Sequence, residues 1–143
     1  MSNCEFCDYV DFKSQVVFST EDTFVIYPRK PVFKYHFILF PKLHSSVIHE
    51  ASEKSVKDIF KTINKFVSAF GKNNDKFEGY NIFSNNGSKF VGQTVYHSHM
   101  RIFLRFSDEK NSPYAFMNGP VDIDEQTEAE RAANIEEFSS IIN

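Results

Sequence analysis

The sequence predicts an α+β domain, in which a helix packs on a mostly antiparallel sheet and a helical extension follows at the carboxyl end. Short runs of β-branched and aromatic residues come first, one long amphipathic pattern follows, and two more strand-like runs come next. This order differs from the strand–helix alternation that builds parallel sheets. The length of 143 residues is that of one domain with a single core.

Composition and charge exclude several classes of protein. Charged residues make up 24% and aromatic residues 16% of the chain, which is too apolar for a disordered protein. No apolar run approaches the roughly 20 residues of a membrane span, so we expect no membrane partner. The net charge is −3 and no basic stripe is present, so we expect no duplex nucleic acid partner. The amino terminus lacks a basic segment followed by an apolar one, which predicts a cytoplasmic protein.

Five strands and two helices are predicted. Turn residues at 19–22 separate the first two strands, and Pro41 ends the third. The predicted strands are 16–18, 24–27, 36–40, 80–84 and 95–106. The segment 72–79 is polar and turn-like, and 107–120 contains Pro, Gly and Asn residues typical of a loop.

The long helix is predicted over residues 52–70, with Ser52 as its N-cap and Gly71 at its end. Its apolar residues recur at steps of three and four: Val56, Ile59, Phe60, Ile63, Phe66, Val67 and Phe70. A final helix is predicted from Thr127, which forms a capping box with Glu130.

Both cysteines of the chain lie at its start, as Cys4 and Cys7. Two cysteines this close in a cytosolic protein indicate metal ligation or redox chemistry rather than a stabilising disulfide. A two-cysteine knuckle supplies half of a tetrahedral zinc site, and the five histidines are the candidates for the other half. The alternatives are that the thiols pack as small hydrophobic groups near a frayed end, or that they carry out thiol chemistry.

The segment from Gly92 to Phe103 carries the most chemistry. On a strand, alternate side chains share a face, so His97, His99 and Arg101 would point the same way, with neighbours about 6.6 Å apart. Tyr96, Met100 and Ile102 would then face the core. Two imidazoles and a guanidinium in a row suit an anion, and a phosphate best. The alternative is an edge strand whose polar residues face water.

This segment resembles the signature of the histidine triad nucleotide-binding family, a Gly-Gln-Ser/Thr lead-in followed by His-x-His-x-His. The resemblance covers most of residues 1–106. It includes further motifs in the family's order: Cys4-x-x-Cys7, His36, Pro41-Lys42-Leu43-His44 and Asn85-Asn86-Gly87. We therefore expect a histidine-triad domain over residues 1–106, with 107–143 as a carboxyl-terminal extension in the same compact unit.

The resemblance implies a nucleotide hydrolase or transferase that cleaves phosphoanhydride or phosphoramidate bonds at the α-phosphorus. His99 takes the position of the nucleophile, which would form a nucleotidyl-histidine intermediate. Arg101 and Gln93 match the other catalytic positions. Nucleotide-binding positions are matched by Gly92, Gln93, Thr94 and Asn85, or Asn86 if the register differs by one residue. Phe6 and Ile26 either line the base pocket or are ordinary core residues. The expected partners are a nucleotide or dinucleotide ligand and a second copy of the chain, in a homodimer whose sheets join.

The same resemblance assigns the metal ligands. Cys4, Cys7, His44 and His97 match the four ligands of the zinc-containing branch. Four protein ligands leave no open position on the metal, so the expected Zn²⁺ is structural and would tie the knuckle to the catalytic segment.

Two departures from the family pattern bear on activity. Arg101 replaces the third histidine; it holds phosphate oxygens well but is a poor proton donor. The alternative function is therefore a zinc-stapled nucleotide-binding module with weak or no turnover. Where the family places an Asp for the ribose, the chain reads Tyr27-Pro28-Arg29-Lys30. One hypothesis is that Arg29 or Lys30 meets an additional phosphate; the other is that both are solvated loop residues.

Overall fold

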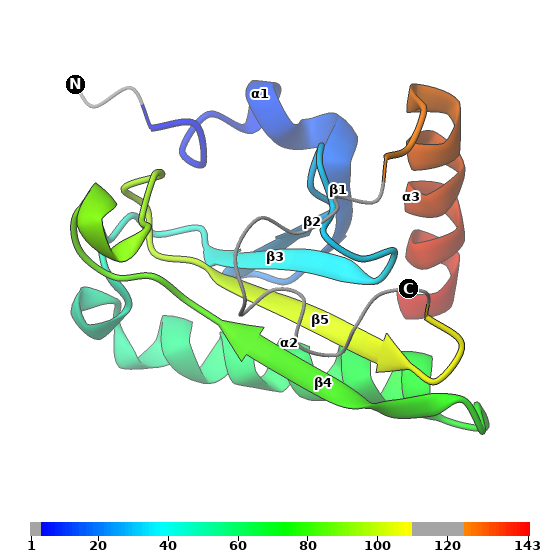
Figure 1. Ribbon diagram of the computed structural model, residues 1–143. Coiled ribbons are helices and arrows are strands. Elements are labelled where there is room, and N and C mark those ends of the chain that lie inside the picture. Colours follow the sequence, from blue (N-terminus) through cyan, green and yellow to red (C-terminus); the bar gives the residue numbers. More distant parts are fainter. Residues whose placement is uncertain (1–3, 110–124) are drawn as a thin grey trace.

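The computed structural model describes residues 4–109 and 125–143, and it shows a five-stranded sheet with helices on both faces (Figure 1). The strands are β1 (Val16–Ser19), β2 (Thr23–Ile26), β3 (His36–Pro41), β4 (Phe77–Phe83) and β5 (Met100–Phe106). Their order in the sheet is β1-β2-β3-β5-β4, and every neighbouring pair is antiparallel. The predicted fold class is confirmed.

Within residues 4–109 and 125–143, three α-helices and three short 3₁₀ turns accompany the sheet. The helices are α1 (Tyr9–Phe12), α2 (Glu53–Gly71) and α3 (Glu128–Ile142), and the turns span Lys13–Gln15, Ile48–Glu50 and Lys89–Val91. In the described part of the chain, no helix has the length and apolar character that crossing a membrane requires.

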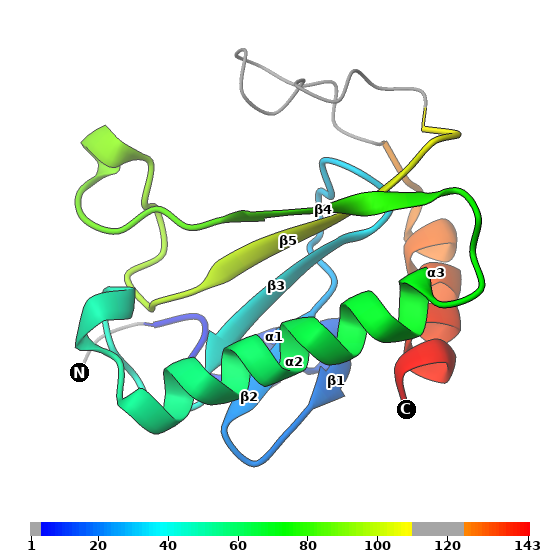
Figure 2. The ribbon, with the colours of Figure 1, turned by 90° about the horizontal axis from the view of Figure 1, so that it is seen from below.

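The central strand β3 is buried on both faces of the sheet. Phe37 and Leu39 point toward α2, while Ile38 and Phe40 point to the opposite face, as the two-residue period of a strand dictates. Figure 2 shows α2 lying across one face, with α1 on the other side of the sheet. The larger core therefore lies under α2, and a smaller cluster lies under the amino-terminal segment, beside the candidate site.

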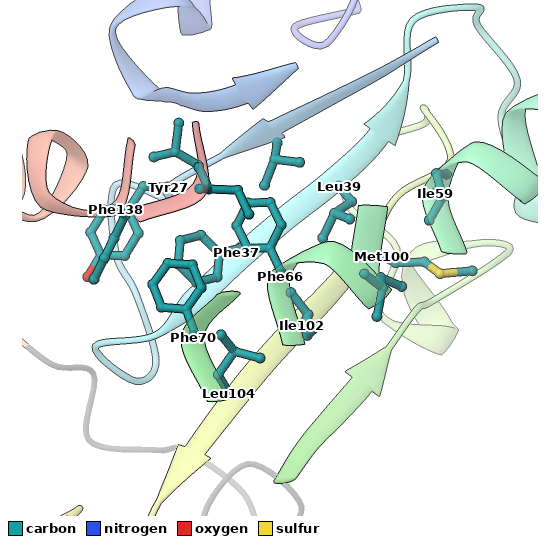
Figure 3. Packing of buried hydrophobic residues seen from close by; sticks show 14 of the residues in the cluster. Tyr27, Phe37, Leu39, Ile59, Phe66, Phe70, Met100, Ile102, Leu104 and Phe138 are labelled. Atoms are coloured by element: carbon teal, nitrogen blue, oxygen red, sulfur yellow. The ribbon is translucent and has the colours of Figure 1, made fainter. Parts of the chain in front are cut away.

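The helix α2 forms where the sequence predicts it. Ser52 caps its first turn, because its hydroxyl oxygen accepts a hydrogen bond from the Ser55 N–H at 3.1 Å. Its apolar face contributes Ile59, Phe66 and Phe70 to the main core, where they meet side chains of β3 and β5 (Figure 3).

The helix α3 joins the same core. Thr127 and Glu130 form the predicted capping box, with both reciprocal hydrogen bonds present. Phe138 is fully buried, and its ring lies 5.2 Å from that of Phe37 and 5.7 Å from that of Phe70. The predicted loop at 107–120 lies mostly outside the described residues.

Replacing Phe138 with alanine is expected to lower the free energy of unfolding by about 3–5 kcal/mol, because the change leaves a cavity among packed rings. The matched control is Phe90→Ala, since Phe90 is 98% exposed and its loss should cost under about 0.5 kcal/mol. Urea denaturation of both variants measures the difference. Equal stabilities would contradict the placement of α3 on this core.

Several sequence-based boundaries are wrong. The last strand begins at Met100 rather than Val95, because the residues before it bond to loops instead of a neighbouring strand: the Ser98 N–H donates to the Ser45 carbonyl at 2.6 Å. Tyr96 therefore does not pack in the core and is 48% exposed. β4 begins at Phe77, inside the predicted loop. The short helix α1 has no counterpart among the predicted elements.

Candidate functional site

Four potential metal ligands converge at the amino-terminal knuckle. The donor atoms of Cys4, Cys7, His44 and His97 all lie within 4.8 Å of one another. The Cys4 and Cys7 sulfurs lie 3.4 and 3.6 Å from His97 Nδ1. His44 Nδ1 lies 3.3 Å from Cys7 Sγ and 3.2 Å from His97 Nδ1. The tight turn between the cysteines, closed by Cys7 N–H to the Cys4 carbonyl at 2.9 Å, brings the two thiols together.

These distances fit a tetrahedral zinc site. Bonds of about 2.3 Å to sulfur and about 2.0–2.1 Å to nitrogen place sulfur and nitrogen ligands about 3.6 Å apart, and two nitrogens about 3.3 Å apart. The observed separations lie close to both values. Two thiolates and two imidazoles are also a ligand set typical of structural zinc. The cluster is therefore compatible with zinc in both chemistry and geometry.

The protein orients one candidate ligand, His97, and sets the protonation state of another, Cys7. His97 is fully buried and its Nε2–H donates to the Pro41 carbonyl at 2.7 Å, which leaves the Nδ1 lone pair facing the cluster. Burial, followed by hydrogen bonding and charge from Cys4, raises the pKa of the Cys7 thiol to about 11. Without a metal that thiol is protonated at neutral pH, so metal binding would release a proton.

Phe6 connects the knuckle to His97 and His99. Its ring stacks on Phe40 with centroids 4.3 Å apart. The same ring meets His97 edge-on at 5.9 Å and His99 edge-on at 5.5 Å. Phe6, which lies between Cys4 and Cys7 in the sequence, thus contacts both the candidate metal ligand His97 and the imidazole of His99.

A cavity of about 470 Å³ lies against the knuckle, α1 and the sheet. Apolar side chains supply part of its wall, among them Phe6 and the predicted base-pocket residue Ile26. His99 and Arg101 also line it. The described residues that line the cavity are Glu5, Phe6, Asp11, Phe12, Gln15, Ile26, Pro28, Arg29, Ile38, Val95, His99 and Arg101.

The His99 imidazole is held in one tautomer. Its Nδ1–H donates to the His97 carbonyl at 2.7 Å, so Nε2 carries the lone pair. Burial lowers the pKa of His99, and the positive charge of Arg101 lowers it further, whereas the hydrogen bond to His97 and the charge of Glu5 act in the opposite direction. A neutral imidazole with a defined lone pair is a competent nucleophile near pH 7.

Arg101 presents an uncompensated positive charge to the same cavity. Burial lowers the pKa of its guanidinium, but arginine stays protonated in proteins. Among residues 4–109 and 125–143, no carboxylate lies within ion-pair distance of Arg101. A partly buried cation without a partner is unfavourable, so this position favours an anionic ligand.

His36 lies on the same face of the sheet, one strand away from Arg101. It is 1% exposed; its Nδ1 accepts from the Val32 N–H at 3.1 Å, and its Nε2 has no hydrogen-bond partner within the described residues. Burial, and then the charge of Arg101, lower the pKa of His36 to about 3. It is therefore neutral and adds no charge to the site.

The loop before His97 is braced by its own side chains. Gln93 is buried; its amide oxygen accepts from the Gly87 N–H at 2.7 Å, and its Nε2 donates to the carbonyls of Ser46 and Val95. Asn85 Nδ2 donates to the Gly92 carbonyl at 3.1 Å. Both side-chain amides thus bond to backbone groups of the protein. The catalytic role expected of Gln93 and the nucleotide contact expected of Asn85 stay predictions.

Gly92 is required by the loop geometry. Its φ is 92°, in the left-handed region that favours glycine, and a Cβ there would lie 2.8 Å from Asn85 Nδ2. Thr94 is exposed and lines a second cavity of about 450 Å³. Glu5 and Val95 line both cavities, so the two lie next to each other.

The sequence did not identify four polar residues that line the main cavity: Glu5, Asp11, Gln15 and, as a cavity residue, Arg29. Arg29 Nε donates to Gln15 Oε1 at 3.3 Å, and its Nη2 donates to the Asp11 carbonyl at 3.4 Å. The sequence places no carboxylate at 27–30, yet folding brings two carboxylates to the cavity from the amino-terminal segment. Asp11 belongs to α1, whereas Glu5 is a variable position inside the Cys4-x-x-Cys7 turn, so no sequence motif marks either carboxylate.

The family model of the HIT domain matches residues 11–108 of this chain. The chain belongs to the HIT domain family.

Two relatives and one solved structure illustrate the likeness. "Protein hit" of Bacillus subtilis is 33% identical over 73% of this chain and 72% of its own length. Adenosine 5'-monophosphoramidase hnt1 of Schizosaccharomyces pombe is 28% identical over 86% of this chain and 90% of its own length. A zinc-bound histidine triad family protein from Mycobacterium smegmatis has a TM-score of 0.74 at 22% identity, covering 98% of this chain and 93% of that one. At that identity the match shows the fold.

Proposed function

We propose that this protein is a nucleotide hydrolase or transferase that cleaves phosphoanhydride or phosphoramidate bonds at the α-phosphorus. The observation that carries the proposal is the pairing, on one cavity, of His99, whose Nε2 lone pair is available, with Arg101, which has no carboxylate partner among the described residues. The Schizosaccharomyces pombe relative, an adenosine 5'-monophosphoramidase, supports the same chemical class.

The proposed reaction has two steps. The His99 Nε2 lone pair forms a bond to the α-phosphorus, and the bond from phosphorus to the leaving group breaks, with its electron pair departing on that group. The His97 carbonyl, which accepts from Nδ1–H, stabilises the positive charge on the imidazole. Water then attacks phosphorus, the P–N bond breaks, its electron pair returns to Nε2, and the proton of the water passes to solvent.

Arg101 stabilises the phosphoryl oxygens in both steps. Its fork of N–H donors matches phosphate geometry, and its position in a partly buried site strengthens each contact. It cannot supply a proton to the leaving group. Substrates whose leaving group departs as a stable anion, such as the phosphate of an anhydride, should therefore react faster than phosphoramidates, whose amine leaving group needs a proton.

The remaining site residues have supporting roles in this proposal. Gln93, Asn85 and Gly92 hold the loop that precedes His97, and Phe6 and Ile26 contribute apolar wall for the base. Thr94 lines the adjacent cavity, where the leaving part of a dinucleotide or other ligand would lie.

We also propose that Cys4, Cys7, His44 and His97 hold a structural Zn²⁺. When bound, the metal supplies a crosslink and no catalytic group, because four protein ligands complete its coordination. The zinc-bound histidine triad family protein from Mycobacterium smegmatis, which shares this fold, supports the assignment. Cys4 and Cys7 thereby fix Phe6 against the imidazole of His99.

A homodimer is part of the proposal. The strand β4 lies at one edge of the sheet, and among the described strands it pairs with β5 alone. Tyr80 and Ile82 on this strand are 47% and 40% exposed. An edge strand with exposed apolar side chains is suited to pairing with a second copy, which would join the two sheets.

Arg101 itself favours a second candidate function, a nucleotide-binding module with little turnover, because the site lacks a proton donor at that position. Replacing Arg101 with methionine is expected to weaken AMP binding about 10–100-fold, since one charge-assisted hydrogen bond is worth about 1.5–3 kcal/mol. Isothermal titration measures the affinity, and unchanged binding would contradict the phosphate role of Arg101.

The variant Arg101→His separates the two functions. For an enzyme that prefers anionic leaving groups, it should raise adenosine phosphoramidate turnover while cleavage of a dinucleoside polyphosphate, already present in the wild type, changes little. If the wild type cleaves neither substrate and Arg101→His cleaves both, the native protein is a binding module.

A further inference from the structure

The cavity has two polar ends separated by an apolar floor. Arg101 on β5 is in register with Ile38 on β3, and Ile38 is in register with Ile26 on β2. Two strand spacings, about 10 Å in all, therefore separate the Arg101 end from β2. Arg29 follows Ile26 by three residues, and Asp11 belongs to α1, which lies over the β1–β2 side of the sheet (Figure 1).

The far end combines a donor group with an acceptor group. Arg29 is tethered by Nε to Gln15 and by Nη2 to the Asp11 carbonyl, which leaves three of its five N–H donors for a ligand. Gln15 is itself fixed, since its Nε2 donates to the Tyr27 carbonyl at 3.1 Å. In the part of the chain that the structure describes, the Asp11 carboxylate makes neither a side-chain hydrogen bond nor an ion pair.

This combination disfavours a second phosphate. A phosphate near Arg29 would also meet the negative charge of Asp11, and like charges at short range repel. The pair instead suits an uncharged group that offers acceptors and donors side by side. Guanine is such a group, with acceptors at O6 and N7 that match an arginine fork, and N–H donors at N1 and N2 that match a carboxylate. Adenine has a lone pair at N1, which would face the carboxylate.

We propose that Asp11 and Arg29 read the nucleobase and make this site selective for guanosine over adenosine nucleotides. The inference rests on the proposed function, since the phosphate at His99 and Arg101 orients the base toward α1. The base lies between apolar walls, with Phe12 and Ile26, which are 3% and 2% exposed, beneath it. Arg29 donates to O6 and N7, and Asp11 accepts from N1 and N2.

Isothermal titration of the zinc-loaded wild type with GMP, IMP and AMP tests this proposal. GMP should bind about 10–100-fold more tightly than AMP, the worth of one charge-assisted hydrogen bond, with IMP between them because it lacks only the N2 amine. Asp11→Asn and Arg29→Met should reduce GMP affinity toward that of AMP and leave AMP affinity within about threefold. Lys30→Met is the matched control, because Lys30 neighbours Arg29 but does not line the cavity.

The possible outcomes are distinct. Equal affinities for GMP and AMP in the wild type overturn the base assignment while leaving the proposed function intact. An equal loss of both nucleotides in Asp11→Asn assigns that carboxylate to the sugar or to folding, and also overturns it. Tighter binding of guanosine 3',5'-bisphosphate than of GMP, lost in Arg29→Met, would show that a second phosphate occupies this end. Binding of no nucleotide at all contradicts the proposed function itself.

Discussion

Replacing His99 with alanine is expected to lower the turnover of a dinucleoside polyphosphate about 10⁴-fold, because the covalent route through Nε2 is lost. The expected affinity for AMP changes by less than about tenfold, since Arg101 and the apolar walls remain. Loss of rate without loss of binding is the pattern of a group that acts on the reacting phosphorus. Steady-state rates together with titration of AMP measure both quantities.

The matched control is His49→Ala, in an exposed 3₁₀ turn that lines neither cavity. It should retain wild-type turnover. If His99→Ala turns over as fast as His49→Ala, then the nucleophile is another group and the proposed mechanism fails.

Removing the metal is expected to have the largest effect on stability. Structural zinc contributes folding free energy directly, and its loss also leaves the buried His97 facing two thiols. We expect Cys4→Ser to lower the free energy of unfolding by at least about 4 kcal/mol. For a domain of this size, that corresponds to a fall in melting temperature of about 10 °C. Calorimetry and elemental analysis of the purified variant measure both effects.

A chelator provides the control for this prediction. It should lower the melting temperature of the wild type and leave that of the double variant Cys4→Ser, Cys7→Ser unchanged, because the variant has no metal to lose. A wild-type protein that contains no zinc, and whose two thiols titrate freely, would instead support thiol chemistry at the knuckle.

Much of the fold follows from local sequence patterns. The spacing of Ile59, Phe66 and Phe70 predicts α2, and the Thr127–Glu130 capping box predicts α3, because both signals depend on neighbouring residues alone. The predicted start of β5 at Val95 is wrong, because hydrogen bonds to distant parts of the chain decide the conformation there. His97 and Ser98 have strand-like neighbours in the sequence, but their hydrogen bonds go to Pro41 and Ser45.

The residues of the candidate site also fall into two groups, those that a sequence motif marks and those that only the fold brings to the cavity. Cys4, Cys7, His44 and His97 could be identified because a family motif marks each of them, and the structure brings all four together. The Asp11 and Arg29 end of the cavity could not be found in this way. Asp11 reaches the cavity only because α1, a single turn of four residues, packs over the sheet.

The same contrast explains the missing ribose carboxylate. Residues 27–30 include no carboxylate, so the sequence pattern identifies no residue for binding the ribose. The carboxylates that do line the cavity, Glu5 and Asp11, come from the amino-terminal segment, and of these Asp11 is assigned to the base rather than to the ribose.

The proposed reaction requires a bond between Nε2 of His99 and phosphorus during turnover. To detect that bond, the wild type is mixed with a nucleotide labelled at its α-phosphorus and quenched in a denaturant without acid. Peptide mapping then locates the label. The account predicts label on the peptide that contains His99, and none in His99→Ala. Steady turnover with no labelled peptide, or label on a different residue, would contradict it.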